Sequence, residues 1–409
     1  MRPLLVAAAL ALAAASPGIA GAQEPPPEPR YEVFLLTMAQ GAEVWELFGH
    51  NALLIRDRAT GEDLAWNWGL FDFEQEAFIP RFLRGTMEYS MGPARLEPFL
   101  AGYAAANRTV FANEVLLTQE DAAALDAFVR WNFQPENRNY RYDYFRDNCS
   151  TRLRDALDGV LGGAIFAALG DRRTPHSYRW HVRRLVQDDV WLDQGISFMF
   201  GTGVDRPLTA WETAFLPVEL LKHLEEVQRP DGQGGMRPLL GPRQVLFEAT
   251  RPAEPEAPPA FSFLWVAAGL AAAGGIGWVG RQAWRRKRWA KAGLFAVVTV
   301  WGLFSGILGL LLVLFWFSHH VSVHWNGNLF HLSPLALALP VLVLRDLRGK
   351  ACASAGAGAR LALLIALLSV GAAVIQLTPL FAQGNAEVIA LGLPVNLALA
   401  WVLTRFPAE

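Results

Sequence analysis

The 409-residue sequence contains few cysteines and almost no net charge. Cys149 and Cys352 are its only cysteines, and Cys149 is alone in the first 351 residues. Lysine and arginine total 36 against 38 aspartate and glutamate residues, a formal net charge of −2. This balance gives no electrostatic indication of nucleic-acid binding. No internal repeat is evident, so a repeat architecture is not indicated either.

Apolar residues, in contrast, are abundant and unevenly distributed. They make up 53% of the chain, and the mean hydropathy of +0.22 is too high for an ordinary soluble protein. Residues 1–22 contain one arginine, a short apolar run and a closing "AGA", which predicts a secretory signal peptide cleaved after Ala22. The run is too short and too broken, at residues 16–18, to span a membrane comfortably. Residues 23 onward are therefore expected to leave the cytoplasm.

The exported chain divides into three regions by composition. Residues 23–226 are typical of a globular domain and carry two helix-start signals, "TQED" from Thr118 and "TAWE" from Thr209. Residues 227–259 contain seven prolines and little periodicity, which indicates a linker. Residues 260–409 are predicted to form a transmembrane domain.

The transmembrane domain is expected to contain about five helices. Each apolar segment approaches the length that crosses a hydrocarbon core, although the third is short and contains Pro334 and Pro340. The predicted spans are 260–280, 292–317, 329–345, 361–380 and 386–404.

The charges of the connecting loops predict the orientation of these spans. The loops "RQAWRRKRWAK" and "RDLRGKACASAGAGAR" are basic, whereas "SHHVSVHWNGN" and "TPLFAQGNAE" contain no lysine or arginine. Basic loops face the cytoplasm. We therefore expect a multi-pass protein of the inner membrane, with residues 23–259 on the periplasmic side and the C-terminus in the cytoplasm. Cys352 then lies on the opposite side of the membrane from Cys149, which excludes a disulfide between them.

Cys149 lies where an aromatic segment enters an amphipathic helix, predicted over residues 149–161. Asp147, Asn148 or Ser150 is suited to cap the start of that helix. A thiol there lies at the positive end of the helix dipole, which lowers its pKa, and nearby amide groups can hold an oxyanion. The sequence therefore marks Cys149 as a candidate nucleophile. A cysteine that only fills space in the core is the alternative.

A cysteine nucleophile needs a base, and His50 is the best placed histidine. It follows Gly49 and begins an apolar segment that is predicted to be a strand. A histidine on a strand facing a cysteine at a helix start is the geometry of papain-type enzymes. Asn67, between two tryptophans of the next predicted strand, is a candidate third member that orients the imidazole. A hydrogen-bonded core asparagine is the alternative for Asn67.

Several motifs resemble the Lnb N-terminal periplasmic domain family. They are "FGHNALLIRD", "WNWGLFDFEQEAFIPRFLRGTMEYSM", "YRYDYFRDNCSTRLRDAL", "FGTGVDRPLTAWETAFLPVEL" and, between spans, "SHHVSVHWNGNLFHLSPLAL". The resemblance implies an α+β fold, a circularly permuted papain-like (NlpC-type) domain followed by an α-helical transmembrane bundle. It also implies a lipoprotein N-acyltransferase with Cys149 as nucleophile and His50 as base. The assignment of Asn67 rests on strand order.

Other residues are candidates for contact with substrate. Asn148 is expected to stabilise the oxyanion, Asp147 is expected to be a supporting residue beside it, and no metal or other cofactor is expected. Each remaining candidate also has a plain structural interpretation, as a turn, a solvated loop or a solvated side chain. These candidates are Arg152, Asp205, Arg206, His320, Asn326 and Asn328.

The predicted function is acyl transfer on a lipoprotein or phospholipid substrate at the outer leaflet, through a thioester on Cys149. The spans fit this prediction because a lipid anchor does not readily leave the bilayer. Two rival classes remain. One is an enzyme of the same fold with another substrate, either a cell-wall peptidase or amidase or a lipid hydrolase. The other is a non-enzymatic envelope protein that binds lipid or assists assembly.

Overall fold

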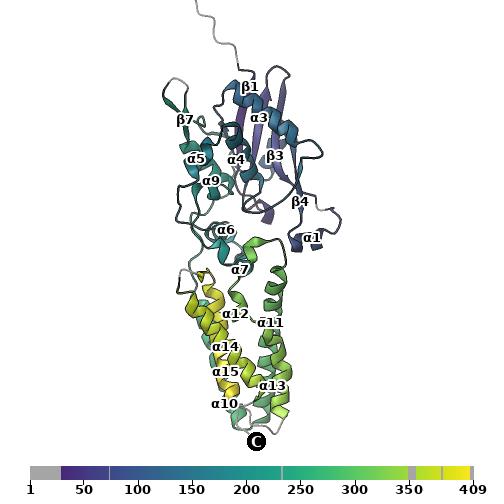
Figure 1. Ribbon diagram of the computed structural model, residues 1–409. Coiled ribbons are helices and arrows are strands. Elements are labelled where there is room, and N and C mark those ends of the chain that lie inside the picture. The colour runs from purple at the N-terminus through teal and green to yellow at the C-terminus, as the bar shows by residue number, and fades with distance from the viewer. Residues whose placement is uncertain (1–28, 73, 232–233, 349–355, 379–380, 406–409) are drawn as a thin grey trace, which may run out of the picture.

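The protein consists of a sheet-containing domain and a helical bundle stacked end to end (Figure 1). The computed structural model describes residues 29–72, 74–231, 234–348, 356–378 and 381–405. The predicted signal peptide, residues 1–22, and Cys352 lie outside these residues. The expected combination of an α+β domain and an α-helical bundle is confirmed.

The core of the first domain is an antiparallel sheet of seven strands in the order β6-β4-β3-β2-β1-β5-β9. The strands β2 and β3, which were expected to carry the candidate base and its partner, are neighbours near the centre. Their bounds are β1 Tyr31–Met38, β2 His50–Asp57, β3 Glu62–Leu70, β4 Glu88–Arg95, β5 Val110–Glu114, β6 Asn139–Arg141 and β9 Gln244–Phe247.

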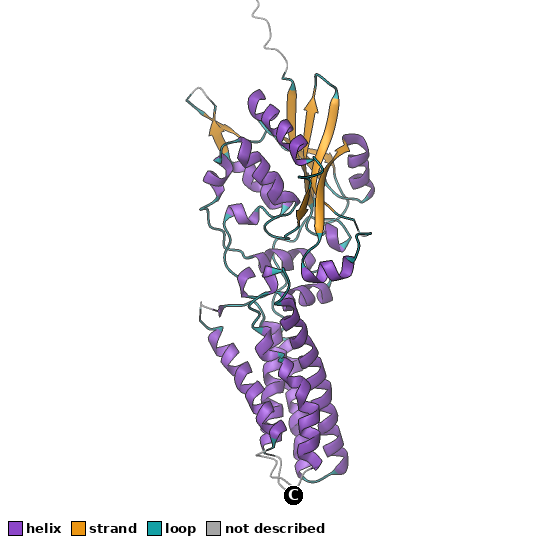
Figure 2. Ribbon diagram, turned by 45° about the vertical axis from the view of Figure 1, so that its right-hand side comes forward, coloured by secondary structure: helices purple, strands orange, loops and turns teal. Residues whose placement is uncertain are grey.

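Helices cover both faces of the sheet (Figure 2). Leu53 and Ile55 of β2 pack on the face covered by α3 (Gln119–Asn132), α4 (Cys149–Val160) and α9 (Pro217–Glu226). Ala52 and Leu54 point to the opposite face, which is covered by α2 (Leu96–Ala105). Side chains alternate between the two faces along a strand, and β2 carries apolar side chains on both faces. Both faces are therefore buried.

Local sequence signals place the helices of this domain. Thr118 caps α3 and Thr209 caps α8, each in a capping box with an acidic residue three positions later, as predicted. The other helices are α1 Phe78–Arg84, α5 Ala164–Leu169, α6 Tyr178–Val186, α7 Val190–Met199 and α8 Ala210–Thr213, with short 3-10 helices at Val44–Glu46 and Thr202–Val204.

The segment 227–259 is more structured than a linker. It forms the hairpin of β7 (Gln228–Pro230) and β8 (Met236–Pro238), and β9 then pairs with β5 at the edge of the main sheet. The interpretation as a Pro-rich linker is therefore corrected. Pro230 and Pro238 end the edge strands β7 and β8, Pro242 lies between β8 and β9, and the other four prolines follow β9, outside any strand.

Among the described residues of the bundle, four helical segments are long and apolar enough to cross a membrane, at Arg288–Phe315, Asn328–Arg348, Ala357–Ile375 and Ala386–Thr404. The predicted span at 260–280 forms α10, which is rich in glycine and alanine and is not among the four. It packs along α15, where the indole of Trp284 donates to the carbonyl of Val402 at 3.2 Å. The bounds are α10 Leu264–Trp284, α11 Arg288–Phe315, α12 Asn328–His331, α13 Leu339–Arg348, α14 Ala357–Ile375 and α15 Ala386–Thr404.

The span at Asn328–Arg348 is irregular because it contains two prolines. Its α12 and α13 are separated by a 3-10 helix at Pro334–Ala338, and another 3-10 helix, Val321–Val323, precedes it. The facing helix α11 carries Gly306 and Gly309, where a side chain would collide with this irregular segment. Small residues thus let the two segments approach closely.

Candidate active site

Cys149 is the first residue of α4 and lies against the end of β3. A side chain at Gly69, near the end of β3, would lie 3.5 Å from the Cβ of Cys149. Gly69 also has a φ of 88°, which side chains rarely adopt. The backbone turn therefore favours glycine at this position, whereas a side chain there would make only an ordinary contact with the cysteine.

Three backbone amides surround the thiol, and burial sets its pKa. The N–H groups of Asn51, Ser150 and Cys149 itself act to lower the pKa of the thiol, but burial is the larger effect and raises it. The expectation that the helix start produces a thiolate is therefore wrong for the resting protein. The amides remain suitable donors for negative charge that develops during a reaction.

Asn67 holds the imidazole of His50 in one orientation. Its Oδ1 lies 3.0 Å from Nε2 of His50, while its Nδ2 donates to the carbonyl of Ala65 at 2.9 Å. Because a carbonyl only accepts, the second bond fixes the amide so that Oδ1 faces the ring. Nε2 of His50 then carries the proton, and Nδ1 is the basic nitrogen.

His50 is neutral because it is buried. Its pKa is lowered to about 4, mainly by burial and also by the nearby charge of Arg108, and the bond with Asn67 only partly opposes this shift. The imidazole ring also stacks on Tyr103, with 6.3 Å between the ring centroids. The guanidinium of Arg108 in turn lies over the Tyr103 ring, 4.8 Å from its centroid. The resting pair is therefore a neutral thiol and a neutral imidazole.

Cys149 and His50 belong to one corner of the domain. His50 and Asn51 begin β2, and the Asn51 amide faces the thiol. The side chain of Asn51 donates to the hydroxyl of Ser150 at 3.1 Å, which ties the start of α4 to the start of β2. Among the described residues, no hydrogen bond joins the thiol to the imidazole directly.

Asn148 and Asp147 have structural partners. The Asn148 side chain accepts from the N–H groups of Ser150 and Thr151, and it donates to the carbonyls of Tyr144 and Phe215. Both of its N–H donors are thus engaged, which corrects the expectation that this side chain supports an oxyanion. Asp147 forms an ion pair with Arg152 at 2.5 Å, and Arg152 lies over the ring of Tyr140.

Asp205 and Arg206 occupy different environments. Asp205 accepts from the buried guanidinium of Arg179 at 2.7 and 2.9 Å. Arg206 forms an exposed ion pair with Glu212, in the first turn of α8. Asp205 therefore neutralises a buried cation, and these contacts do not support the predicted contact of either residue with substrate.

Asn326 and Asn328 fasten the bundle to the periplasmic domain. The amide of Asn326 donates to the carbonyls of Phe198 and Met199, and that of Asn328 also donates to Phe198. These carbonyls end α7, where backbone acceptors lack helical partners. Both asparagines are buried, so the expectation that they contact lipid is corrected.

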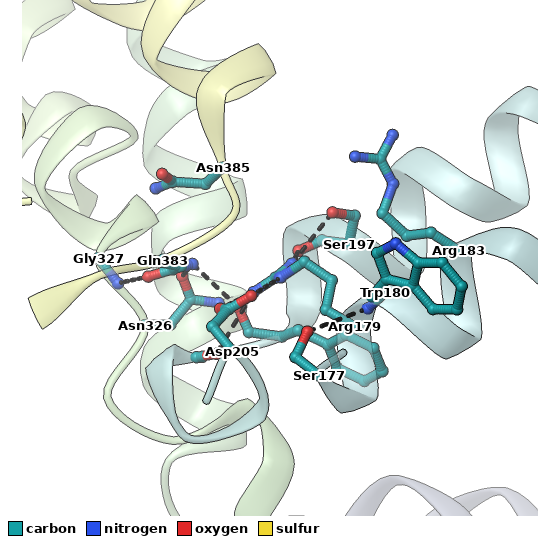
Figure 3. A network of polar contacts seen from close by, with 12 residues as sticks. Ser177, Arg179, Trp180, Arg183, Ser197, Asp205, Asn326, Gly327, Gln383 and Asn385 are labelled. Atoms are coloured by element: carbon teal, nitrogen blue, oxygen red, sulfur yellow. Dashed lines mark hydrogen bonds and ion pairs between the residues drawn. The ribbon is translucent and has the colours of Figure 1, made fainter. Parts of the chain in front are cut away.

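The same junction includes the loop before α15 (Figure 3). Gln383 accepts from the N–H of Gly327 at 2.7 Å and donates to the carbonyl of Phe200 at 2.9 Å. Arg183 of α6 pairs with Glu387 of α15 at 3.2 Å. Polar contacts from two loops of the bundle therefore hold α6, α7 and the following segment in place.

His320 contacts the other side of the periplasmic domain. Its Nε2 donates to the carbonyl of Phe82 in α1 at 2.7 Å, and its ring stacks with Tyr144 at 6.3 Å between centroids. The preceding residue, His319, donates its backbone N–H to Arg84 at 2.8 Å. His320 therefore connects the loop of residues 318–327, which we call the outer loop, with the segment that leads into α4.

Two family models match the chain in the order of its two parts. The Lnb N-terminal periplasmic domain matches residues 28–186, and the Lnb transmembrane domain matches residues 278–383. The chain belongs to the Lnb family. It is a membrane protein with a periplasmic N-terminal domain, and its Cys149, His50 and Asn67 all fall within the first match. No curated protein and no solved structure matched the chain.

In this Lnb-family chain, the sequence did not reveal the residues that form the environment of Cys149, His50 and Asp205. Gly69 supplies a positive-φ turn beside Cys149, and Tyr103, itself covered by Arg108, stacks on His50. Arg179 neutralises Asp205 from α6, distant in sequence. A glycine inside a predicted strand was the one available signal, since it often marks a close approach of another segment.

Proposed function

We propose that this protein is a thiol acyltransferase that acts on a lipid-anchored ester at the outer surface of the inner membrane. The proposal is supported by the corner where three backbone amides face the thiol of Cys149, one of them from Asn51, the neighbour of the oriented His50, on a domain fastened to a membrane bundle. Such a corner contains a nucleophile, a base and oxyanion donors, the three elements of covalent acyl transfer.

In the first half of the reaction, Nδ1 of His50 takes the proton of the Cys149 thiol as the sulfur attacks the ester carbonyl. The carbonyl π pair moves to oxygen, and backbone N–H groups near the sulfur stabilise that oxyanion. When the tetrahedral intermediate collapses, the ester C–O bond breaks and imidazolium His50 protonates the leaving alkoxide. The products are a thioester on Cys149 and a lyso alcohol.

In the second half, the N-terminal amine of the lipoprotein attacks the thioester. His50 accepts the proton that the amine loses, and it returns a proton to the sulfur as the C–S bond breaks. The acyl chain is then held by an amide, and the enzyme is restored with no cofactor. Transfer within one lipoprotein, from its glyceryl ester to its own amine, is the reaction implied by the Lnb family.

The proposed orientation follows from the ends of the bundle. The loops around His320 and Gln383, which contact the periplasmic domain, lack lysine and arginine. Arg288 and Arg348 lie at the opposite ends of their helices. Basic residues remain on the cytoplasmic side, so we place the C-terminus there.

The test uses the full-length protein in proteoliposomes with a synthetic diacylated lipopeptide. We expect mass spectrometry to detect acyl migration to the terminal nitrogen and a transient acyl adduct on Cys149. Cys149→Ala is expected to abolish both, while Cys352→Ala, the matched control, retains both. A Cys149→Ala protein as active as the parent would overturn the proposal.

The same assay separates the rival functions. Release of free fatty acid without migration would identify a lipid hydrolase, and cleavage of a murein stem peptide would identify a peptidase or amidase. Absence of turnover in every arm, together with absence of an adduct on Cys149, would indicate a non-enzymatic protein. Each of these outcomes contradicts acyl transfer.

A further inference from the structure

A row of aromatic rings connects the surroundings of Cys149 with the outer end of a membrane span. We call it the aromatic track and define it as Tyr142, Tyr144, His320, Phe82 and Phe315. The centroid of Tyr142 lies 5.4 Å from that of Tyr144, which lies 6.3 Å from His320. His320 in turn lies 6.2 Å from both Phe82 and Phe315.

The upper end of the track lies beside the nucleophile. A side chain at Gly69 would be 3.6 Å from Tyr142 and 3.5 Å from Cys149, so both residues border the same small space. Tyr142 also packs against the core cluster that contains Cys149. The ring stacks on Tyr89 at 4.1 Å, which holds it in place from the other side.

The lower end of the track lies at the membrane. Phe315 is the last residue of α11, the longest candidate span, and Phe317 just beyond it is 85% exposed. Next to the track, α1 exposes Ile79 and Leu83, which is costly in water but favourable at a lipid surface. The track therefore begins where a bilayer would end.

Two rings of the track are exposed, and the other three are half-buried. Tyr144 is 45% exposed and Phe82 is 43% exposed. His320 is held by its bond to the Phe82 carbonyl, so the membrane loop and α1 keep one arrangement. The result is a fixed row of aromatic rings, two of which are exposed.

We propose that the aromatic track binds the acyl chain of a lipoprotein's diacylglyceryl anchor and guides its ester from the bilayer to Cys149. This inference rests on the proposed function. A bilayer-anchored ester must leave the hydrocarbon region to reach the periplasmic domain, and an apolar path keeps its methylenes out of water on the way. The two ends of the track match the two ends of that path, because one lies at a span and the other at the thiol.

Photolabelling tests occupancy of the track without relying on activity. The full-length Cys149→Ala protein is placed in liposomes of phosphatidylethanolamine and phosphatidylglycerol with a diacylated lipopeptide that carries a diazirine in its ester-linked chain. We expect label on Tyr142, Tyr144 or Phe82, displaced by excess unlabelled lipopeptide. Label confined to the membrane helices, or displaced equally by added phospholipid, would overturn the inference.

A chain-length series tests use of the track. With soluble acyl esters of 2 to 12 carbons, each added methylene is expected to raise kcat/KM by about fourfold while it contacts the track. Tyr144→Ala and Phe82→Ala should lower kcat/KM for the longest ester by about tenfold or more and leave the shortest ester within twofold. Trp131→Ala, which removes another exposed aromatic side chain, on α3, is the control and should change neither.

The two proposals fail in different ways. If Cys149→Ala cleaves the shortest ester as fast as the parent, the proposed function is wrong, and the photolabelling result still decides the track. If cleavage depends on Cys149 but the track variants slow long and short esters equally, the track is wrong and the acyl-transfer proposal stands.

Discussion

Nε2 of His50 lies 3.0 Å from Oδ1 of Asn67, and the second bond of Asn67, to the Ala65 carbonyl, fixes the direction of that contact. The two residues belong to neighbouring antiparallel strands, whose last described pair is Ala52 with Asn67. The pairing thus determines which imidazole nitrogen is free to act as a base. It also turns a buried polar residue of the sheet into a part of the candidate active site.

Asn67→Ala should lower kcat/KM because the imidazole loses its orientation and its preferred tautomer. We expect a loss of roughly tenfold to a hundredfold, below the 10²- to 10⁴-fold contribution of general base catalysis as a whole. The measurement is acyl migration on the diacylated lipopeptide. Asn113→Ala, which removes a buried asparagine of β5 that bonds Gly241, is the control and should retain activity. Equal activity of the two variants would contradict the role of Asn67.

The acid limb of the pH profile of kcat/KM should lie at an unusually low pH. Burial lowers the pKa of His50 to about 4, and the base is competent only when neutral. Activity is therefore expected to stay level from about pH 8 down to about pH 5 and to fall as the pH drops through about 4. Samples returned to neutral pH should recover full activity, which excludes unfolding. A limb near the ordinary histidine value of about 6.5 would show that His50 is solvated or is not the base.

Asp205→Ala should destabilise the periplasmic domain strongly. It leaves the guanidinium of Arg179 buried without its counter-ion, which costs about 3 to 5 kcal/mol of unfolding free energy. Arg206→Ala, at the next residue, breaks an exposed pair and should cost at most about 1 kcal/mol. Urea unfolding followed by tryptophan fluorescence measures both. Similar losses for the two variants would show that the buried pair has no special importance.

Gly201→Ala should detach the outer loop from the periplasmic domain. A Cβ there would overlap the carbonyl oxygen of His324, whereas the N–H of the same glycine donates to Ser322 at 2.9 Å. We expect faster proteolysis within residues 318–327 and lower activity on the lipid-anchored substrate. Gly203→Ala is the matched control because a side chain there meets open space. Unchanged proteolysis in Gly201→Ala would contradict a rigid junction at this contact.

Features set by neighbours in the chain were predictable. The helix that begins at Cys149, the strand that begins at His50 and the Thr118 cap were all expected from a few adjacent residues. The apolar runs similarly predicted the helices of the bundle, and Pro334 and Pro340 marked the one that is irregular. Such features depend on backbone propensity and side-chain period, which act over a few positions.

The resting state of the thiol was not predictable in the same way. The helix start and its amides were visible in the sequence, and they do act to lower the pKa of Cys149. Burial by residues from β2, β3 and other distant segments has the larger, opposite effect. Similarly, the side-chain amide of Asn148 donates a hydrogen bond to the carbonyl of Phe215, which is 67 positions away.

The sequence by itself determined the combination of a mixed α/β domain with membrane segments and the candidates for nucleophile and base, because each of these depends on composition or on local pattern. Only the tertiary structure decided that Asn326 and Asn328 fasten the bundle to α7, that Arg179 neutralises Asp205, and that aromatic rings from three segments form one track. These contacts join residues far apart in the chain. Their partners are chosen by how the domain and the bundle pack, and no local pattern records that choice.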